Sequence, residues 1–242
     1  MKLVTIDFHN TLFSCDTWFR LEVEDLPDAV LDSFVDHEQT GVHQRRIEAR
    51  ETYREIRRVA MDSGVECDAE ESIWRVAQRL DLPFSREQLD NSIRAVMLDA
   101  LNDAHPMSGA TELVNDLYAD GFKLGVVSSA AYHPFLEWCL DRFQLRDAFS
   151  HVVTSADCGV YKSDPAIYRH TLKLFGVEPD CAVHIGDSHR FDVASAAAVG
   201  MRTILVARQR DPALTPAPDA VIRTLGDARP ELDRLLRTTE TR

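Results

Sequence analysis

The chain has 242 residues, of which 45% are hydrophobic, and it carries a formal net charge of −13 at pH 7. This length and composition predict a globular protein with one full α/β domain and an additional segment, large enough to bury a core without cross-links. The negative charge disfavours nucleic acid and anionic membrane surfaces as partners, because both would repel the chain.

Cysteine usage and the amino-terminal sequence bear on the compartment. The five cysteines lack the paired spacing of a zinc site or a disulfide framework, which favours a reducing cytoplasm. An acidic residue interrupts the first apolar run before a secretory segment could develop, and no later run is long enough to span a bilayer. We therefore expect a soluble, cytoplasmic protein, whose oligomeric state the sequence leaves unknown.

The first predicted element is a short strand at residues 3–6, with the sequence LVTI. Its apolar and β-favouring residues are typical of a strand that is buried on both faces of a sheet. Asp7 follows directly, at the carboxyl end of this strand, where ligands bind in open α/β sheets. On this segment alone, Asp7 is either a functional carboxylate or simply the first residue of a turn.

Helical spacing replaces the strand pattern from residue 14 to residue 105. Three amphipathic helices are predicted, at about residues 49–60, 68–80 and 85–100. Asp68 with Glu71, and Ser85 with Gln88, have the spacing of capping boxes at the starts of the second and third helices. The segment therefore reads as an all-helical insert of the size of a small domain.

After Pro106, helices and strands alternate, which predicts a parallel sheet with helices on its faces. The further strands are expected at residues 122–129, 151–153, 181–186, 203–207 and 220–224. Asp164 and Pro165 have the character of a cap and first-turn pair for a helix that ends at Gly176. A helix rich in small residues is expected after the fourth of the core strands, ending at Gly200.

Polar and charged side chains that could take part in a reaction stand at the predicted strand ends. They are Asp7, Ser128, Ser129, Lys162, Asp187 and Asp192. A carboxylate such as Asp7 can attack phosphorus and hold the group as an aspartyl phosphate. Mg²⁺ prefers a few carboxylate oxygens together with a phosphate oxygen and water, which suits Asp7 and Asp187. A hydroxyl and an ammonium group would then stabilise the charge on the remaining phosphate oxygens.

In these segments the sequence resembles the haloacid dehalogenase superfamily of hydrolases. The four matching motifs are DFHNT at residues 7–11, Ser128, Lys162 within GVYKSDP, and GDSHRFD at residues 186–192. The resemblance implies a doubly wound, Rossmann-like parallel sheet formed by residues 1–13 and 106–242. It also implies that residues 14–105 form a helical cap domain that closes over the substrate.

The resemblance further implies an aspartyl-enzyme phosphatase with Mg²⁺ as its cofactor. In that mechanism Asp7 is the nucleophile and a metal ligand, and Asp187 is a metal ligand. Asp192 is either a further ligand or an acidic residue that contacts the ligands without touching the metal. Ser128 and Lys162 hold the phosphate. Two further hydroxyls, those of Thr11 and Ser129, are candidates for phosphate binding, and the choice between Ser128 and Ser129 stays open because a register error of one residue would exchange them.

His9 is the main departure from the family pattern. Phosphatases of this superfamily usually carry aspartate two positions after the nucleophile, as the acid and base of the reaction. Either the His9 side chain performs this work, or His9 contributes only its backbone carbonyl to the metal. Smaller departures are Ser163 and Phe191, which replace residue types that are frequent in the motifs.

The leading functional hypothesis is a Mg²⁺-dependent hydrolase of a small phosphorylated metabolite. One alternative is a metal-independent 2-haloacid dehalogenase, in which the same aspartate attacks carbon. The pair Asp187 and Asp192 disfavours it, because a site without metal gains nothing from clustered, uncompensated carboxylates. A second alternative is a non-catalytic binding protein that uses the same scaffold.

Overall fold

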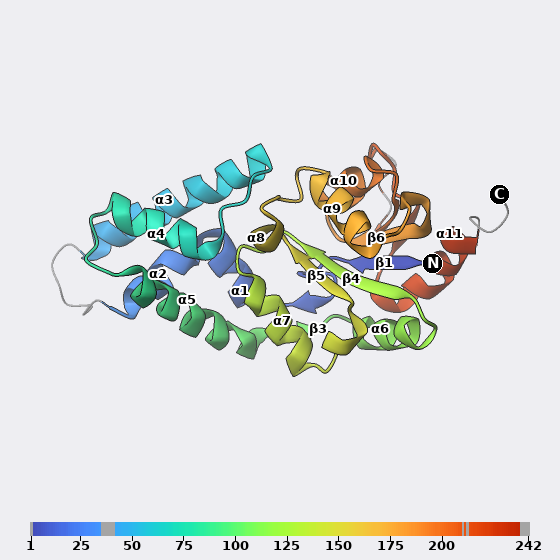
Figure 1. The fold of residues 1–242 in the computed structure, drawn as a ribbon, viewed down its shortest axis with the longest axis horizontal. Coiled ribbons are helices and arrows are strands. Elements are labelled where there is room, and N and C mark those ends of the chain that lie inside the picture. The colour runs from blue at the N-terminus through green and yellow to red at the C-terminus, as the bar shows by residue number, and fades with distance from the viewer. Residues whose placement is uncertain (1, 35–41, 210, 212, 238–242) are drawn as a thin grey trace.

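A computed structural model describes residues 2–34, 42–209, 211 and 213–237 of the chain. Its central feature is a six-stranded parallel sheet with helices on both faces (Figure 1). The strands of this sheet are β1 Leu3–Ile6, β4 Lys123–Ser128, β5 His151–Thr154, β6 Ala182–Gly186, β7 Arg202–Val206 and β8 Ala220–Ile222. The doubly wound α/β architecture predicted from the sequence is thereby confirmed.

The strand order β5-β4-β1-β6-β7-β8 places the first strand in the middle of the sheet. From β1 the chain builds outward through β4 and β5, and then returns to build β6, β7 and β8 on the other side. Ile6, the last residue of β1, pairs with Val126 and with Ile185. The carboxyl ends of β1, β4 and β6 therefore meet at the point where the winding reverses, which is the usual ligand site of such sheets.

Alternating side chains of β1 fill two apolar layers, as expected for a strand buried on both faces. Val4 and Ile6 belong to the larger core cluster, while Leu3 belongs to a second cluster on the opposite face. Each of the three is fully buried, which contributes roughly 2 kcal/mol per side chain to folding. The main helices that supply the layers are α6 Ala110–Ala119, α7 His133–Arg142 and α11 Ala228–Arg237 on the larger side, and α9 Ala166–Phe175 and α10 Ser195–Ala197 on the other. Short elements complete the described core: η3 Arg146–Ala148, α8 Ser155–Cys158, η4 Pro179–Cys181 and η6 Leu225–Asp227.

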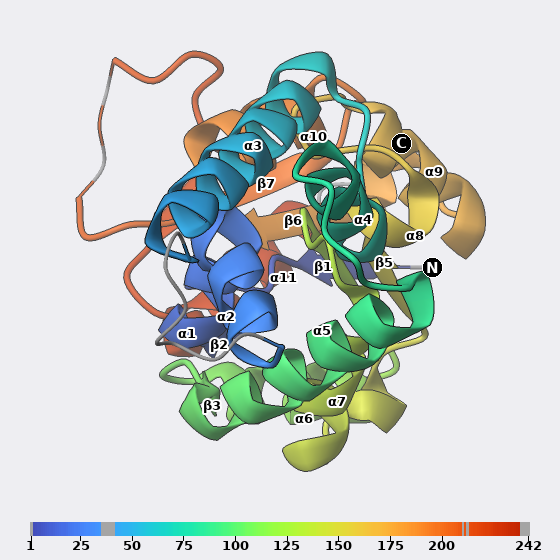
Figure 2. The ribbon, with the colours of Figure 1, turned by 90° about the vertical axis from the view of Figure 1, so that its left-hand side faces the viewer.

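A separate group of helices lies beyond the carboxyl ends of the strands, at the end of the molecule opposite both termini (Figures 1 and 2). It is connected to the sheet through a two-stranded antiparallel ribbon of β2 Phe13–Ser14 and β3 His105–Pro106. The elements between the two strands are α1 Asp16–Arg20, the π-helical turn η1 Leu21–Asp25, α2 Leu26–Asp32, α3 Val42–Ser63, α4 Ala69–Arg79, α5 Arg86–Ala100 and η2 Leu101–Asp103. This arrangement is compatible with a cap formed by residues 14–105, and we retain those limits as a proposal.

The predicted capping groups act at the start of two of these helices. Ser85 and Gln88 form both hydrogen bonds of a capping box at α5, and the Asp68 side chain accepts the N–H of Glu71 at α4. The first of the three helices, α3, begins at Val42 rather than near residue 49. Its opening turns are mostly polar, so apolar periodicity alone could not reveal them.

Two predictions in the core differ in detail from the structure. Pro165 rather than Asp164 occupies the cap position of α9, while the Asp164 carboxylate accepts the N–H of Ala166. The expected small-residue helix is instead a wide π-helical turn, η5 His189–Ala194, followed by the short α10. None of the described helices combines the length and apolarity that a membrane crossing requires.

Candidate active site

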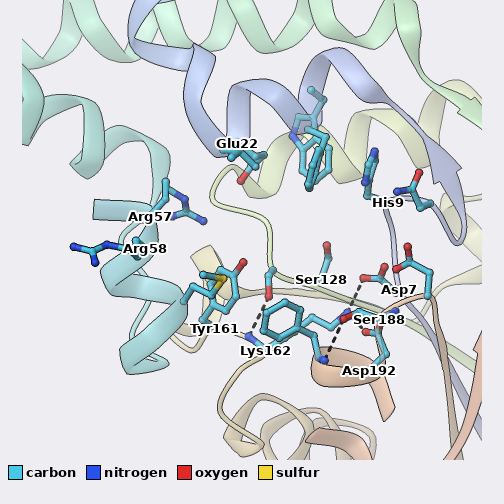
Figure 3. Close-up of a pocket in the computed structure, with 18 of the residues that line it drawn as sticks. Asp7, His9, Glu22, Arg57, Arg58, Ser128, Tyr161, Lys162, Ser188 and Asp192 are labelled. Carbon is cyan, nitrogen blue, oxygen red and sulfur yellow. Dashed lines mark hydrogen bonds and ion pairs between the residues drawn. The ribbon is translucent and has the colours of Figure 1, made fainter. Parts of the chain in front are cut away.

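Asp7 lies at the centre of the reversal point of the sheet. Its N–H donates to the carbonyl of Ile185 over 2.8 Å, which continues the strand pairing by one residue. The chain then turns tightly, with the N–H of Phe13 donating to the carbonyl of Phe8 over 2.8 Å, and the Phe8 ring is fully buried. The backbone that carries Asp7 is thus fixed by strand pairing on one side and by an anchored turn on the other. In Figure 3 its carboxylate faces the cavity.

Lys162 reaches Asp7 from the loop between α8 and α9. Its Nζ atom lies 2.6 Å from Oδ1 of Asp7 and also forms an ion pair with Asp192, and its side chain is only 3% exposed. Burial alone would lower the pKa of Lys162, but the charges of Asp192 and Asp7 raise the pKa well above its ordinary value. The loop itself is held by the Ser129 hydroxyl, which accepts the N–H of Lys162 over 3.0 Å. The ammonium therefore stays charged and in place.

Asp192 is anchored from several directions. In addition to Lys162, its carboxylate faces Nε2 of His184 at 3.1 Å and accepts hydrogen bonds from the Ser188 N–H at 2.8 Å and from the Tyr168 hydroxyl at 3.4 Å. Although burial would raise the pKa of Asp192, Lys162 and His184 together lower it well below its ordinary value. The wide turn η5 makes this possible, because it folds Asp192 back onto the residue that precedes the turn.

Gly186, the last residue of β6, leaves the room that Asp192 needs. A Cβ atom at this position would lie 2.2 Å from Cγ of Asp192, closer than any real contact. Glycine is therefore required here by close approach of a side chain rather than by backbone conformation.

Asp7, Asp187 and Asp192 together form an acidic cluster, with one carboxylate oxygen of each lying within 4.8 Å of the others. Burial raises the pKa of Asp7 to about 7, Lys162 opposes this change, and Asp192 and Asp187 reinforce it. Burial likewise raises the pKa of Asp187 to about 6. Three carboxylates with one ammonium leave excess negative charge, so a divalent cation with a preference for oxygen ligands fits this set of donors.

His9 lines the same cavity, close to Asp7. Its ring stacks on Phe19 with 4.4 Å between the ring centroids, and its Nε2 atom lies 3.6 Å from Oδ1 of Asp16. Burial lowers the pKa of His9, while the Asp16 carboxylate acts in the opposite direction. The imidazole is thus positioned by contacts with the inserted segment as well as by its own turn.

The remaining predicted hydroxyls occupy different positions. Ser128, the last residue of β4, and Ser129 both line the cavity, and Ser128 points toward its centre (Figure 3). Thr11 is buried and does not belong to the lining, and its hydroxyl has no hydrogen-bond partner within the described part of the chain. Phosphate binding by Thr11 therefore stays a prediction.

Sequence reasoning missed His184 and Tyr168, both of which touch Asp192. His184 lies within buried β6, and its Nδ1 atom is 2.8 Å from the Thr5 hydroxyl. The only local signal was a polar residue in an otherwise apolar strand, which calls for a hydrogen-bond partner. Tyr168 lies in α9, and its hydroxyl donates to the carbonyl of Phe191 over 2.9 Å.

The cavity above these groups has a volume of about 540 Å³, within the range of small-molecule sites. Asp7, Ser128, Lys162 and the fourth-motif loop form its floor, and α1, η1 and α3 form the opposite wall (Figure 3). The residues contributed by that wall are Trp18, Phe19, Glu22, Val23, Arg54, Arg57, Arg58 and Met61.

Fold and site together define an α/β protein with an acidic, lysine-containing centre at the switch point of its sheet. The family model of haloacid dehalogenase-like hydrolases matches residues 33–206, more than half of the chain. The chain therefore belongs to the haloacid dehalogenase-like hydrolases.

Among curated proteins, haloacid dehalogenase-like hydrolase domain-containing protein 3 of Bos taurus is 41% identical over 101 residues, covering 42% of this chain and 39% of the bovine protein. Glyceraldehyde 3-phosphate phosphatase of Pyrococcus abyssi is 30% identical over 128 residues, covering 52% of this chain and 53% of the archaeal protein. The matches thus span about half or less of these relatives.

Among solved structures, the 2-haloacid dehalogenase from Pseudomonas syringae pv. Tomato DC3000 is similar, with a TM-score of 0.73 and 22% identity. The similarity covers 97% of this chain and 98% of that one. At this identity the likeness concerns the fold alone.

Proposed function

We propose that the protein is a Mg²⁺-dependent phosphatase that hydrolyses a small phosphorylated metabolite through an aspartyl phosphate on Asp7. One observation carries the proposal: Asp7 is held beside the charged Lys162 within a three-carboxylate cluster on the floor of a cavity. The similarity to a curated glyceraldehyde 3-phosphate phosphatase supports the same reaction class.

In the first step, a carboxylate oxygen of Asp7 attacks phosphorus, and the bond between phosphorus and the ester oxygen breaks. The leaving oxygen takes a proton, for which His9 is the proposed donor because it lines the cavity near Asp7. Lys162 and the Ser128 hydroxyl stabilise the negative charge that spreads over the phosphate oxygens.

In the second step, water attacks the phosphorus of the aspartyl phosphate. The bond between phosphorus and the Asp7 oxygen breaks, which releases inorganic phosphate and restores the carboxylate. His9, now neutral, accepts the proton of the attacking water, so the residue returns to its starting state after each turnover.

The donors for Mg²⁺ in this proposal are the Asp7 and Asp187 carboxylates and the backbone carbonyl of His9. When bound, the ion supplies positive charge that draws phosphate in and stabilises the transition state. Asp192 already accepts hydrogen bonds from several groups. We therefore propose that it mainly orients Lys162 and adds negative charge near the metal.

Between the two adjacent serines, we propose that Ser128 holds the phosphate. The Ser129 hydroxyl already accepts the N–H of Lys162 and so keeps the lysine loop in place. Both serines line the cavity, and the difference lies in this existing bond.

The decisive experiment is a screen for phosphate release from a panel of phosphorylated metabolites, with and without Mg²⁺. Because a neighbour in fold is named as a 2-haloacid dehalogenase, chloride release from 2-chloroacids should be measured in parallel, with and without EDTA. Mg²⁺-dependent phosphate release supports the proposal. Metal-independent chloride release would replace it with the dehalogenase, and the absence of both reactions would favour a binding protein.

A further inference from the structure

The wall of the cavity opposite Asp7 carries a group of apolar and aromatic side chains beside its charged residues. They are Trp18, Phe19 and Val23 from α1 and η1 and Met61 from α3, and Tyr161 and Phe191 add two aromatic rings from the side of the floor. Phe19 and Val23 are 46% and 43% exposed although both are hydrophobic. Single exposed apolar residues are common, but a group of them on the wall of a cavity marks a surface for an apolar ligand group.

Arg57 is the buried cation of this wall, and its guanidinium is already engaged. Its Nη1 atom donates to the Glu66 carboxylate over 2.5 Å and to the carbonyl of Cys67 over 2.8 Å. The side chains of Arg57 and Glu66 are 10% and 1% exposed, so the ion pair is shielded from water. A paired charge of this kind offers little net attraction to an anion on the substrate.

Glu22 adds an acidic side chain to the same wall. Its two oxygens accept the N–H groups of Ala131 and Tyr132, at 2.7 and 3.2 Å. These bonds hold Glu22 at the cavity. A substrate carboxylate placed near these two residues would therefore meet a Glu22 side chain that already accepts two backbone N–H groups and an Arg57 guanidinium that is already paired with Glu66.

The other two arginines of the lining lie farther out. Arg54 pairs with Glu24 through its Nε atom at 2.7 Å. Arg58 is exposed, and in Figure 3 its side chain extends away from Asp7. Neither side chain directs an open charge toward the middle of the cavity.

From these contacts we infer that the site takes phosphate monoesters whose organic group is uncharged and largely apolar, and that it disfavours esters with a second anionic group such as a carboxylate. The inference rests on the proposed phosphatase function and specifies its substrate class. The phosphate lies on the floor at Asp7, and the organic group contacts Val23 and Met61 on the opposite wall. Burial of apolar surface there favours binding by about 25 cal/mol for each Å².

A matched pair of substrates tests this inference: 4-methylbenzyl phosphate and 4-carboxybenzyl phosphate. The two esters have nearly the same size and the same type of leaving alkoxide, and they differ in one charge. With the wild-type protein and Mg²⁺, kcat/KM is expected to be at least about tenfold higher for the methyl compound, because the carboxylate would lose water without gaining a counter-charge.

Substitutions of wall residues test whether the preference for the methyl compound arises at this wall. Val23→Ala and Met61→Ala should each lower kcat/KM for the methyl compound by about five- to tenfold, and by a smaller factor for the carboxylated compound. Val59→Ala is the control, because Val59 is an exposed residue of α3 that is not part of the lining. Glu66→Gln removes the counter-charge of Arg57, so it should raise kcat/KM for the carboxylated compound. The ratio of kcat/KM between the methyl and the carboxylated compound should then decrease.

The inference is overturned if the wild-type protein hydrolyses the carboxylated ester as well as or better than the methyl ester. It is equally overturned if Arg58→Gln selectively slows the carboxylated ester, since that result would reveal an anion-binding rim. Absence of phosphate release from both esters, and from the wider metabolite panel, would instead remove the proposed phosphatase function on which the inference rests.

Discussion

The Glu22 carboxylate, on the inserted helical segment, accepts the backbone N–H of Ala131 over 2.7 Å, just beyond the carboxyl end of β4. This bond joins the wall of the cavity to its floor. Because the partner is a backbone group, the bond does not depend on which side chain occupies position 131. Glu22 is 5% exposed, so the link is formed away from water.

The first prediction concerns the pH dependence of stability at Glu22. Burial raises the pKa of Glu22 from 4.5 to about 7, while Arg57 lowers it in part. Between these values the folded protein binds more protons at this site than the unfolded chain does, so the free energy of unfolding contributed by Glu22 falls as pH rises. The contribution amounts to roughly 2–3 kcal/mol across that range.

Glu22→Gln should therefore flatten the pH dependence of urea unfolding between about pH 5 and pH 7. Glu55→Gln, at an exposed position of α3, is the matched control and should retain the wild-type profile. A profile for Glu22→Gln that parallels the wild type would show that Glu22 does not hold its proton in the folded state.

The second prediction concerns the nucleophile. Asp7→Asn keeps the shape of the side chain but removes the attacking charge, so phosphate release should fall at least about a thousandfold. Thermal unfolding of the variant should remain cooperative, with a measurable midpoint temperature. Asp116→Asn, on the exposed side of α6, should retain full turnover. Substantial turnover by purified Asp7→Asn protein would rule out the covalent mechanism.

The third prediction concerns the metal. Asp187→Ala should weaken Mg²⁺ binding, and part of the lost activity should return at high Mg²⁺, because Asp7 and Asp192 still supply negative charge. Isothermal titration with Mg²⁺ measures the binding directly, without turnover. Asp180→Ala, an exposed aspartate that lies outside the cluster, serves as the control. Unchanged affinity in Asp187→Ala would place the ion elsewhere.

The fourth prediction concerns His9. An alkyl phosphate has a poor leaving group that needs a proton, so His9→Ala should slow its turnover by roughly 100-fold or more. With p-nitrophenyl phosphate the first step needs little acid, so a pre-steady-state burst of nitrophenolate should precede slow hydrolysis of the aspartyl phosphate. His189→Ala is a suitable control, since His189 bonds to the carbonyl of Pro216. Equal rates for wild type and His9→Ala on both substrates would leave only the backbone carbonyl with a role.

The fifth prediction concerns Gly186. In Gly186→Ala the added methyl group must displace Asp192, which also moves the partner of Lys162. Turnover should fall, and the free energy of unfolding should decrease by about 1–3 kcal/mol. Activity measurements and urea unfolding check the two effects. Normal values of both would mean that η5 can shift without disturbing the site.

The sequence was sufficient for the floor of the site because each of its residues directly follows an apolar strand or lies in a short motif. Asp7 and Asp187 could be located from strand ends alone, and parallel strands bring such ends together. Lys162 was predicted from the loop that follows the strand at residues 151–153, although no local pattern predicts that a loop lysine turns inward. His184 could not be assigned a partner, since Asp192 returns to it only through the unexpected wide turn η5.

The opposite wall was not predictable in the same way. Arg57 and Glu22 belong to different helices, and helical periodicity does not tell which charged face is solvated and which is turned inward. Their burial depends on how the inserted segment packs on the loops at residues 130–132 and 159–161. Hydrogen bonds between backbone groups, such as that from the Ala69 N–H to the carbonyl of Ala131, determine this packing and leave no trace in composition.

The ribbon of β2 and β3 brings the two ends of the helical segment side by side. The segment that separates them in sequence can therefore lengthen, shorten or be exchanged while the strands that carry Asp7, Ser128 and Asp187 keep their register. Val23 and Met61 lie within that exchangeable segment, and every carboxylate of the acidic cluster lies outside it. Substitutions in that region can therefore change the contacts of the organic group while the three carboxylates keep their positions on the sheet.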